Sequence, residues 1–230
     1  MTTLGGFIAG IAFSPLNQSL YVCNSKLGLF RVEADGRHAP LATGAAGQKI
    51  VCPNYPVFDR RGRLYVTDSG KWKQRNGFLL RFDSDGGGEV IGGPFGYANG
   101  LALSADERWL YMVESDTDRV YRFELTADGQ LGRGEVYAES VGRLPDGLAL
   151  DEAGNLYVAC YASDEIWRIS PSGEKLLLGW DYHAILLSRP KIPAWCGENR
   201  DVLYAANLGR DTITRAILPG VRGQRLAHQF

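Results

Sequence analysis

The sequence lacks the marks of several large protein classes. No apolar run approaches the roughly 18 residues that a membrane helix needs. The formal net charge is only −1 over 230 residues. A charge so close to zero gives no general attraction to phosphate backbones or to anionic membranes. We therefore expect neither nucleic acid nor a membrane as a partner.

Cysteine is scarce, and so are the sequence signs of export. The chain has four scattered cysteines without a C-x-x-C pair: Cys23, Cys52, Cys160 and Cys196. This spacing gives a zinc site little support, and we expect free thiols that are buried or half-buried. The N-terminal stretch "MTTLGGFIAG" has neither the charged start nor the apolar core of a signal peptide, so the expected compartment is the cytoplasm.

Two frequent kinds of catalytic motif are also missing. The chain has no G-x-S-x-G elbow of the serine hydrolases. The glycine-rich stretch "DSDGGGE" at 83–89 follows a predicted outer strand, and no helical pattern succeeds it. A phosphate-binding loop would need that helix. Neither chemistry is therefore expected here.

What the sequence does contain is a repeat. A Leu-Tyr pair recurs at 20–21, 64–65, 110–111, 156–157 and 203–204, at intervals of 44, 46, 46 and 47 residues. Around each pair, short alternating apolar strands are separated by turns rich in glycine. Units of 40 to 50 residues with this pattern are typical of a β-propeller. We expect an all-β fold, with five blades of four short strands and a single domain over residues 1–230.

The repeat places polar residues at equivalent positions of the blades. The first strand of a propeller blade lines the central channel, so residues at one repeat position form a ring. The residue that begins this strand is, in the five units, Ala9, Asn54, Asn99, Asp146 and Ile192. Two amide oxygens and a carboxylate are hard ligands of the kind that Ca²⁺ or Mg²⁺ accepts. Asn-Gly and Asp-Gly pairs are also common turn sequences, so plain turn chemistry remains an alternative.

A second ring is predicted on the same face, three residues past each tyrosine. Its members are Asn24, Asp68, Glu114, Cys160 and Asn207. Asp68 and Glu114 are candidate substrate contacts, with turn or salt-bridge roles as the alternative. Trp72 follows in the polar insertion "GKWKQRN", which we expect over the channel mouth, either in contact with substrate or in an exposed hairpin loop.

The most specific segments resemble a known family. They are "NYPVFDRRGRLYVTDSG", "NGLALSADERWLYMVES", "PDGLALDEAGNLYVACY" and the terminal "DVLYAANLGRDTITRAILPGVRGQRLAH". This sequence resembles the senescence-marker-protein/gluconolactonase/luciferin-regenerating family over essentially its whole length. The resemblance implies a six-bladed propeller with one divalent cation at the channel mouth, and often hydrolysis of a sugar lactone or related lactone.

The resemblance also implies roles for individual residues. It makes Asn99 and Asp146 metal ligands, makes Asp146 the general base, and places Asn54 near both metal and substrate. The family's glutamate ligand from the first blade has no counterpart, which implies that the chain begins after that blade. With Asp146 as the only anionic ligand, we expect weak binding of Ca²⁺ or of another divalent cation such as Mg²⁺, Mn²⁺ or Zn²⁺.

Three functional hypotheses remain open from the sequence. The first is a metal-dependent lactonase in which Asp146 accepts a proton while Asn54 and Asn99 orient metal and substrate. The second is a non-catalytic propeller similar to NHL-repeat scaffolds, which would be indifferent to chelators. The third is an inactive, truncated family member. Neither the lactone nor the oligomeric state can be read from the sequence.

Overall fold

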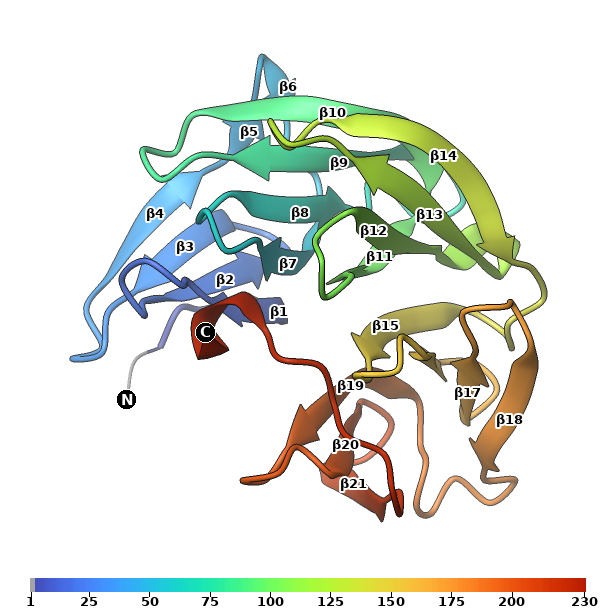
Figure 1. Ribbon diagram of the computed structural model, residues 1–230. Helices are drawn as coiled ribbons and strands as arrows, with labels where there is room; N and C mark the ends of the chain where they lie inside the picture. Colours follow the sequence, from blue (N-terminus) through green and yellow to red (C-terminus); the bar gives the residue numbers. More distant parts are fainter. Residues whose placement is uncertain (1–2) are drawn as a thin grey trace. The chain divides into compact units, whose positions relative to one another are not determined.

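The computed structural model describes residues 3–230, and almost all of its regular structure is β-strand (Figure 1). The helices within these residues are two short 3-10 turns, η1 (Ser115–Thr117) and η2 (Ala227–Gln229). No helix in this part of the chain has both the length and the apolar character that a bilayer span requires.

Successive strands form meandering antiparallel sheets, each with its strands hydrogen-bonded in chain order. The first sheet holds β1 (Ile8–Phe13), β2 (Leu20–Asn24), β3 (Gly28–Val32) and β4 (His38–Ala42). The second holds β7 (Pro53–Phe58), β8 (Leu64–Asp68), β9 (Arg75–Phe82) and β10 (Gly88–Gly96). The third holds β11 (Ala98–Leu103), β12 (Trp109–Glu114), β13 (Arg119–Leu125) and β14 (Leu131–Ala138).

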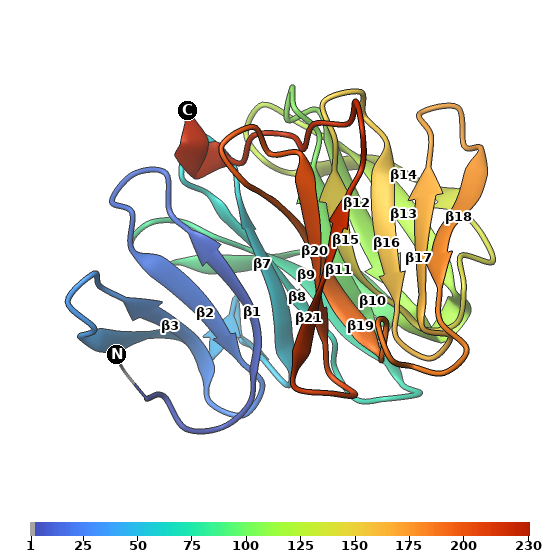
Figure 2. The same cartoon turned by 90° about the horizontal axis from the view of Figure 1, so that it is seen from below.

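The remaining strands complete the series. The fourth sheet holds β15 (Pro145–Leu150), β16 (Leu156–Cys160), β17 (Glu165–Ile169) and β18 (Lys175–Trp180), which lie side by side in Figure 2. The fifth holds β19 (Pro190–Cys196), β20 (Val202–Asn207) and β21 (Thr212–Ile217). A separate small hairpin joins β5 (Gly44–Ala45) to β6 (Gln48–Lys49).

The predicted fold class is confirmed: the chain is all-β and consists of five successive propeller blades. The fifth blade differs from the prediction, because it has three strands within the described residues instead of four. The chain packs as two compact units. The first runs to Leu101 and includes Leu125–Leu131 and Leu226–Phe230, and the second comprises Ala102–Glu124 and Gly132–Arg225. That residues 1–230 form one domain stays a prediction.

Each unit has an apolar core built from the alternating strands. In the first unit, side chains of β2, β7, β8 and β9 form one cluster around Val66, Leu80 and Phe82, which are fully buried. In the second, β12, β15 and β16 form another around Leu156 and Val158. Burial of this apolar surface, at about 25 cal/mol per Å², is the main force that stabilises each unit.

In two blades, the Leu-Tyr pair begins a strand that follows a turn stabilised by a buried aspartate. In the second blade, Oδ1 of Asp59 accepts hydrogen bonds from the Arg61 and Arg63 backbone amides, and Oδ2 lies 3.3 Å from the Tyr65 hydroxyl. In the fourth blade, Oδ2 of Asp151 accepts one from the Tyr157 hydroxyl at 3.0 Å. Burial, followed by the neighbouring carboxylate, raises the pKa of both tyrosines.

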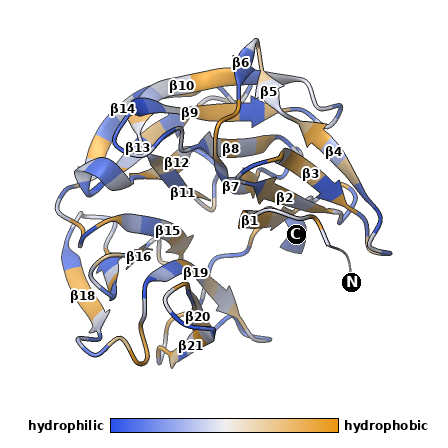
Figure 3. Ribbon diagram, turned by 180° about the vertical axis from the view of Figure 1, so that it is seen from behind, coloured by the Kyte–Doolittle hydropathy of each residue, from blue (hydrophilic) through white to orange (hydrophobic). Residues whose placement is uncertain are grey.

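All four cysteines are free thiols, as the sequence predicts. Cys23 and Cys160 are buried and Cys52 is partly buried, but Cys196 is exposed, which corrects the expectation for that residue. Apolar side chains also reach the surface on outer strands, where Figure 3 shows hydrophobic colour on β18. There Trp180 is 59% exposed.

Candidate functional site

Asn54 begins the innermost strand of the second blade and lies at a β-bulge. Between the pairs that Pro53 and Pro56 make with β8, two residues of β7 face one residue of β8. A bulge turns a side chain out of the regular strand alternation, and bulges are frequent beside active sites. The Asn54 side chain is only 5% exposed, so the bulge directs its amide into the protein and away from bulk solvent.

The hydroxyl of Ser69 fixes the orientation of the Asn54 amide. Nδ2 of Asn54 donates to Ser69 Oγ at 2.9 Å, and this hydroxyl donates to the Ala98 carbonyl at 2.7 Å. Because the nitrogen is engaged in this way, Oδ1 is the atom of the amide that Ser69 leaves available as an acceptor. Oδ1 of Asn54 is buried and accepts no hydrogen bond within the described residues. A buried amide oxygen in this state is a ready ligand for a cation or a donor group.

Asn99, which begins the inner strand of the third blade, is brought close to Asn54 by the same segment of β8. The hydroxyl of Thr67 donates to the Asn99 carbonyl at 2.8 Å and accepts from the Tyr55 amide at 3.1 Å. Asn99 is 3% exposed. Thr67 and Ser69 therefore tie the starts of two neighbouring inner strands together, and two of the predicted site residues lie side by side in the first unit.

Asp68 lies between Thr67 and Ser69 in the sequence and ends β8. Its carboxylate holds the chain segment that leads into β7. Its Oδ1 accepts hydrogen bonds from the Cys52 amide at 2.7 Å and the Gly70 amide at 3.1 Å, and Oδ2 accepts one from the Val51 amide at 2.9 Å. The residue is fully buried. These contacts give Asp68 a structural role; its predicted contact with substrate stays a prediction.

Trp72 lies close to the start of the inner strand of the third blade. Its ring packs edge-on against that of Tyr97, with centroids 4.9 Å apart and planes at 86°. Tyr97 precedes Asn99 by two residues and has a left-handed backbone, with φ of 61°. Trp72 remains 44% exposed. This pair forms an aromatic surface beside Asn99, at the place where the sequence predicts a substrate contact.

In the second unit, Asp146 has the same place in its blade as Asn54. Between the pairs that Pro145 and Leu148 make with β16, two residues of β15 face one residue of β16, and Asp146 is the first of the two. Asp146 is 7% exposed. The hydroxyl of Ser115 donates to the Pro145 carbonyl at 2.6 Å, which repeats the contact of Ser69 with the residue before Asn99.

Glu114 precedes Ser115 at the end of β12 and is fully buried. Its Oε2 accepts a hydrogen bond from the Thr117 hydroxyl at 2.6 Å and lies 3.2 Å from the Tyr121 hydroxyl. The carboxylate thereby stabilises the turn η1 and the start of β13. Its predicted contact with substrate, like that of Asp68, stays a prediction.

The other second-ring residues share a structural role that the sequence did not show. Asn24 donates to the Gly5 carbonyl at 2.6 Å, Cys160 to the Val141 carbonyl at 3.2 Å, and Asn207 accepts from the Ser188 amide at 3.1 Å. In each case the partner lies in the segment that enters the blade. Asp68 behaves in the same way, so this repeat position fixes the entering segment in four blades, and Glu114 of the third blade differs from them.

The donors at the first ring suit a hard cation. They are amide and carboxylate oxygens, and Asn54 supplies a buried oxygen that accepts no hydrogen bond from residues 3–230. No group of three or more His, Cys, Asp or Glu side chains with metal-binding geometry occurs within residues 3–230. The donor set is therefore rich in amide oxygen and poor in charge, which favours low affinity.

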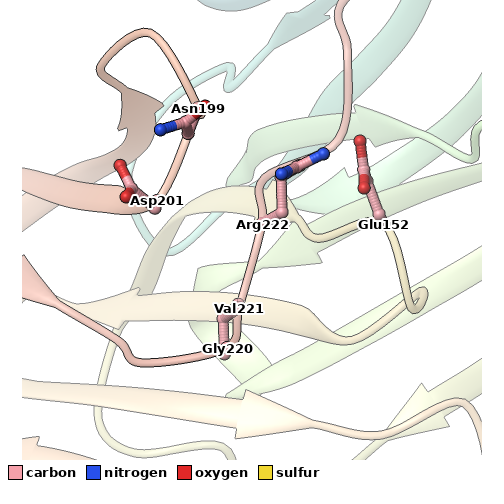
Figure 4. A pocket seen from close by; sticks show the side chains of 6 residues that line it. All are labelled: Glu152, Asn199, Asp201, Gly220, Val221 and Arg222. Atoms are coloured by element: carbon pink, nitrogen blue, oxygen red, sulfur yellow. The ribbon is translucent and has the colours of Figure 1, made fainter.

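A pocket of about 460 Å³ lies at the opposite end of the inner strand from Asp146. It is lined by Glu152, Asn199, Asp201, Gly220, Val221 and Arg222. Figure 4 shows the side chains of Glu152 and Arg222 near one another. Glu152 also pairs with Arg200, whose Nε donates to the Gly223 carbonyl at 2.8 Å. The mixed charges of this pocket largely compensate one another, and no predicted site residue lines it.

Residues 5–207 match the model of the SMP-30/gluconolactonase/LRE-like region. The chain belongs to this family. Its resemblance to the family, predicted from the motifs, is thereby confirmed.

One curated relative is 6-deoxy-6-sulfogluconolactonase of Pseudomonas putida, which is 30% identical over 200 residues. The match covers 84% of this chain and 66% of that protein, so this chain spans just under two thirds of its relative's length. Lactonase drp35 of Staphylococcus saprophyticus is 31% identical, with 82% of this chain and 62% of that protein covered.

Among solved structures, a gluconolactonase from Xanthomonas campestris superposes with a TM-score of 0.78 at 21% identity. The superposition covers 93% of this chain and 73% of that one. At this level of identity the similarity shows the fold alone, and it agrees with the propeller blades described above.

Proposed function

We propose that this chain is a lactonase-type hydrolase, which opens a sugar lactone or a related cyclic ester with the help of a divalent cation. Membership of the SMP-30/gluconolactonase family and relatives that are named lactonases support the reaction type. The structural observation that carries the proposal is Asn54, whose buried Oδ1 is held free of protein donors by the bond from its own Nδ2 to Ser69.

We propose Asn54, Asn99 and Asp146 as the residues that hold the cation. Their oxygens suit Ca²⁺, and the same donors admit Mg²⁺, Mn²⁺ or Zn²⁺. Because only one of the three residues is charged, binding should be weak. A bound divalent cation would polarise the lactone carbonyl and lower the pKa of a nearby water.

The chain's own residues supply the remaining chemistry in this proposal. Asp146 accepts a proton from the attacking water, whose oxygen forms the new bond to the carbonyl carbon as the ring C–O bond breaks. Asp146 returns this proton to the ring oxygen, which leaves as a hydroxyl group, so the carboxylate is regenerated and the product is the open hydroxy acid. Asn54 and Asn99 orient the carbonyl, and the exposed edge of Trp72 packs against the sugar ring.

A rate measurement on two matched variants tests this function. Hydrolysis of a panel of sugar lactones is followed by acid release, with Ca²⁺ and with a chelator. Asp146→Asn should lower kcat by about 10²- to 10⁴-fold, as removal of a general base does. The control is Asp201→Asn. Asp201 lines the pocket with Glu152, at the opposite end of inner strand β15 from Asp146, and its replacement should leave the rate unchanged.

Two results would reject the proposed function. One is an Asp146→Asn rate equal to that of the wild type for every hydrolysed lactone. The other is a wild-type protein that is folded and saturated with cation, yet hydrolyses no member of the panel. The second result would favour a non-catalytic propeller.

A further inference from the structure

The fifth blade carries a lysine at the position that Asn54 and Asp146 occupy in their blades. Between the pairs that Pro190 and Pro193 make with β20, two residues of β19 face one residue of β20. The first of the two is Lys191. Counting back from the repeated tyrosine in the sequence instead selects Ile192. The strand pairing moves the equivalent position by one residue, to Lys191.

Contacts with the preceding blade confirm this equivalence within each unit. In the first unit, a Cβ on Gly10 would lie 2.5 Å from the Asn54 carbonyl oxygen and 2.7 Å from Cδ of Pro56. In the second unit, a Cβ on Gly147 would lie 2.3 Å from the Lys191 carbonyl oxygen and 3.0 Å from Cδ of Pro193.

The two glycines therefore meet the same pair of backbone and proline atoms. The segments "PNYP" at 53–56 and "PKIP" at 190–193 have the same arrangement. The backbone position of Lys191 thus corresponds to that of Asn54.

Lys191 is also next to Asp146. The residue after Asp146 is Gly147, and its backbone touches that of Lys191 directly. Both residues begin the inner strands of adjacent blades in the second unit, β15 and β19. Asp146 is 7% exposed, and Lys191 is partly buried. An ammonium group at this position therefore adds a positive charge to a site with few anionic groups.

We propose that Lys191 occupies the same repeat position as Asn54 and Asp146, and that its ammonium group competes with the divalent cation for the Asp146 carboxylate. The inference rests on the proposed function, because it assumes that the cation binds at Asp146. A fixed charge of the same sign beside a divalent ion raises the free energy of the bound state. The site consequently binds its cation more weakly than its oxygen donors alone would allow.

Calorimetric titration with CaCl₂ tests the inference without any substrate. Lys191→Gln and Lys191→Met both remove the charge, the first with a polar and the second with an apolar side chain of similar length; each should bind Ca²⁺ about tenfold more tightly than the wild type. Lys191→Arg keeps the charge and should bind as the wild type does. The control is Lys175→Gln on outer strand β18, where Nζ donates to the Glu139 carbonyl at 2.7 Å.

The outcomes separate this inference from the function on which it rests. Equal Ca²⁺ affinity in the wild type, Lys191→Gln and Lys191→Met overturns the role of Lys191, even if Asp146→Asn abolishes hydrolysis. Tighter binding in Lys175→Gln as well overturns it too, because the effect would then reflect net charge. If neither wild type nor the Lys191 variants bind Ca²⁺, the inference also fails. Tighter binding that is lost again in Asp146→Asn/Lys191→Gln supports it.

Discussion

The side-chain nitrogen of Asn54 donates to the hydroxyl of Ser69 at 2.9 Å, and that hydroxyl in turn donates a hydrogen bond to the Ala98 carbonyl at 2.7 Å. One serine thus connects the amide of one ring residue to the strand that carries the next, Asn99. Since Oδ1 of Asn54 is the oxygen available to a ligand, its orientation depends on this hydroxyl.

Ser69→Ala should weaken Ca²⁺ binding about 10- to 100-fold, which is the usual effect of losing a group that orients a metal ligand. Without the hydroxyl, nothing distinguishes the two orientations of the Asn54 amide, and half of its conformers present nitrogen instead of oxygen. Titration calorimetry gives the affinity, and the Ca²⁺-induced rise in Tm gives an independent measure.

The matched control for this prediction is Ser14→Ala. Ser14 is also a buried serine of the first unit, but it accepts a hydrogen bond from the Leu16 amide at 3.2 Å at the other end of its blade. It should lower Tm without changing the Ca²⁺-induced rise. An unchanged affinity in folded Ser69→Ala would show that the serine has only a structural role.

Trp72→Ala should raise KM for the best lactone about tenfold while Ca²⁺ affinity stays constant. The exposed ring offers apolar area beside Asn99, and a lost aromatic contact costs roughly 1 kcal/mol or more. Steady-state kinetics together with calorimetry separate the two effects. Trp180→Ala, which removes another exposed tryptophan from outer strand β18, should change neither quantity. If KM is the same in Trp72→Ala and the wild type, Trp72 lies outside the substrate site.

The propeller blades could be predicted because the apolar alternation itself fixes them. Leu64 and Tyr65 are 2% and 0% exposed, and each Leu-Tyr pair lies within the first three residues of its strand. The strand pattern is a local consequence of burial, so a single sequence carries it. The three-stranded fifth blade was missed, although the segment after Ile217 starts with Leu218, Pro219 and Gly220 and shows no alternating apolar run.

Parts of the site depend on contacts that leave no pattern in the sequence. The bulge itself is common to β7, β15 and β19. The hairpin between β19 and β20 is longer, because Tyr204 pairs with Ala194, ten residues earlier, whereas Tyr65 pairs with Val57, eight residues earlier. This is why counting from the tyrosine selected Ile192 where the structure has Lys191. The motif "DSG" at 68–70 reads as turn chemistry, yet Ser69 bonds to two neighbouring strands. The repeated prolines of "PNYP" and "PKIP" were the one available signal for the correct alignment.

Tyr157→Phe should lower the free energy of unfolding by about 1.5 to 3 kcal/mol, the typical contribution of a hydrogen bond to a charged group. The hydroxyl donates to Oδ2 of Asp151 at 3.0 Å, and the ring is fully buried. Urea unfolding of the two proteins measures the difference. Tyr182→Phe, at a ring that is 78% exposed, is the control and should be neutral. Equal stability of Tyr157→Phe and wild type would contradict a contribution from this pair.

The loop between β18 and β19 should loosen in acid because one carboxylate holds it. Oδ1 of Asp181 accepts a hydrogen bond from the His183 amide at 3.0 Å, and Oδ2 accepts from the amides of Ile185 at 2.8 Å and Leu186 at 2.5 Å. These bonds, that of Leu186 first, lower the pKa of Asp181. The stabilisation is therefore fully present above the unfolded pKa of about 3.9 and is lost as the pH falls through the lower folded pKa.

Asp181→Asn tests this at neutral pH, because the neutral amide is a weaker acceptor for these three backbone donors. We expect faster hydrogen exchange at the amides of Ile185 and Leu186 in the variant, and in the wild type a similar increase, relative to intrinsic exchange rates, only below about pH 4. Asp211→Asn, on the exposed turn before β21, is the control and should leave these amides protected. Unchanged protection in Asp181→Asn would mean that the packing of Leu187, and not the carboxylate, fixes the loop.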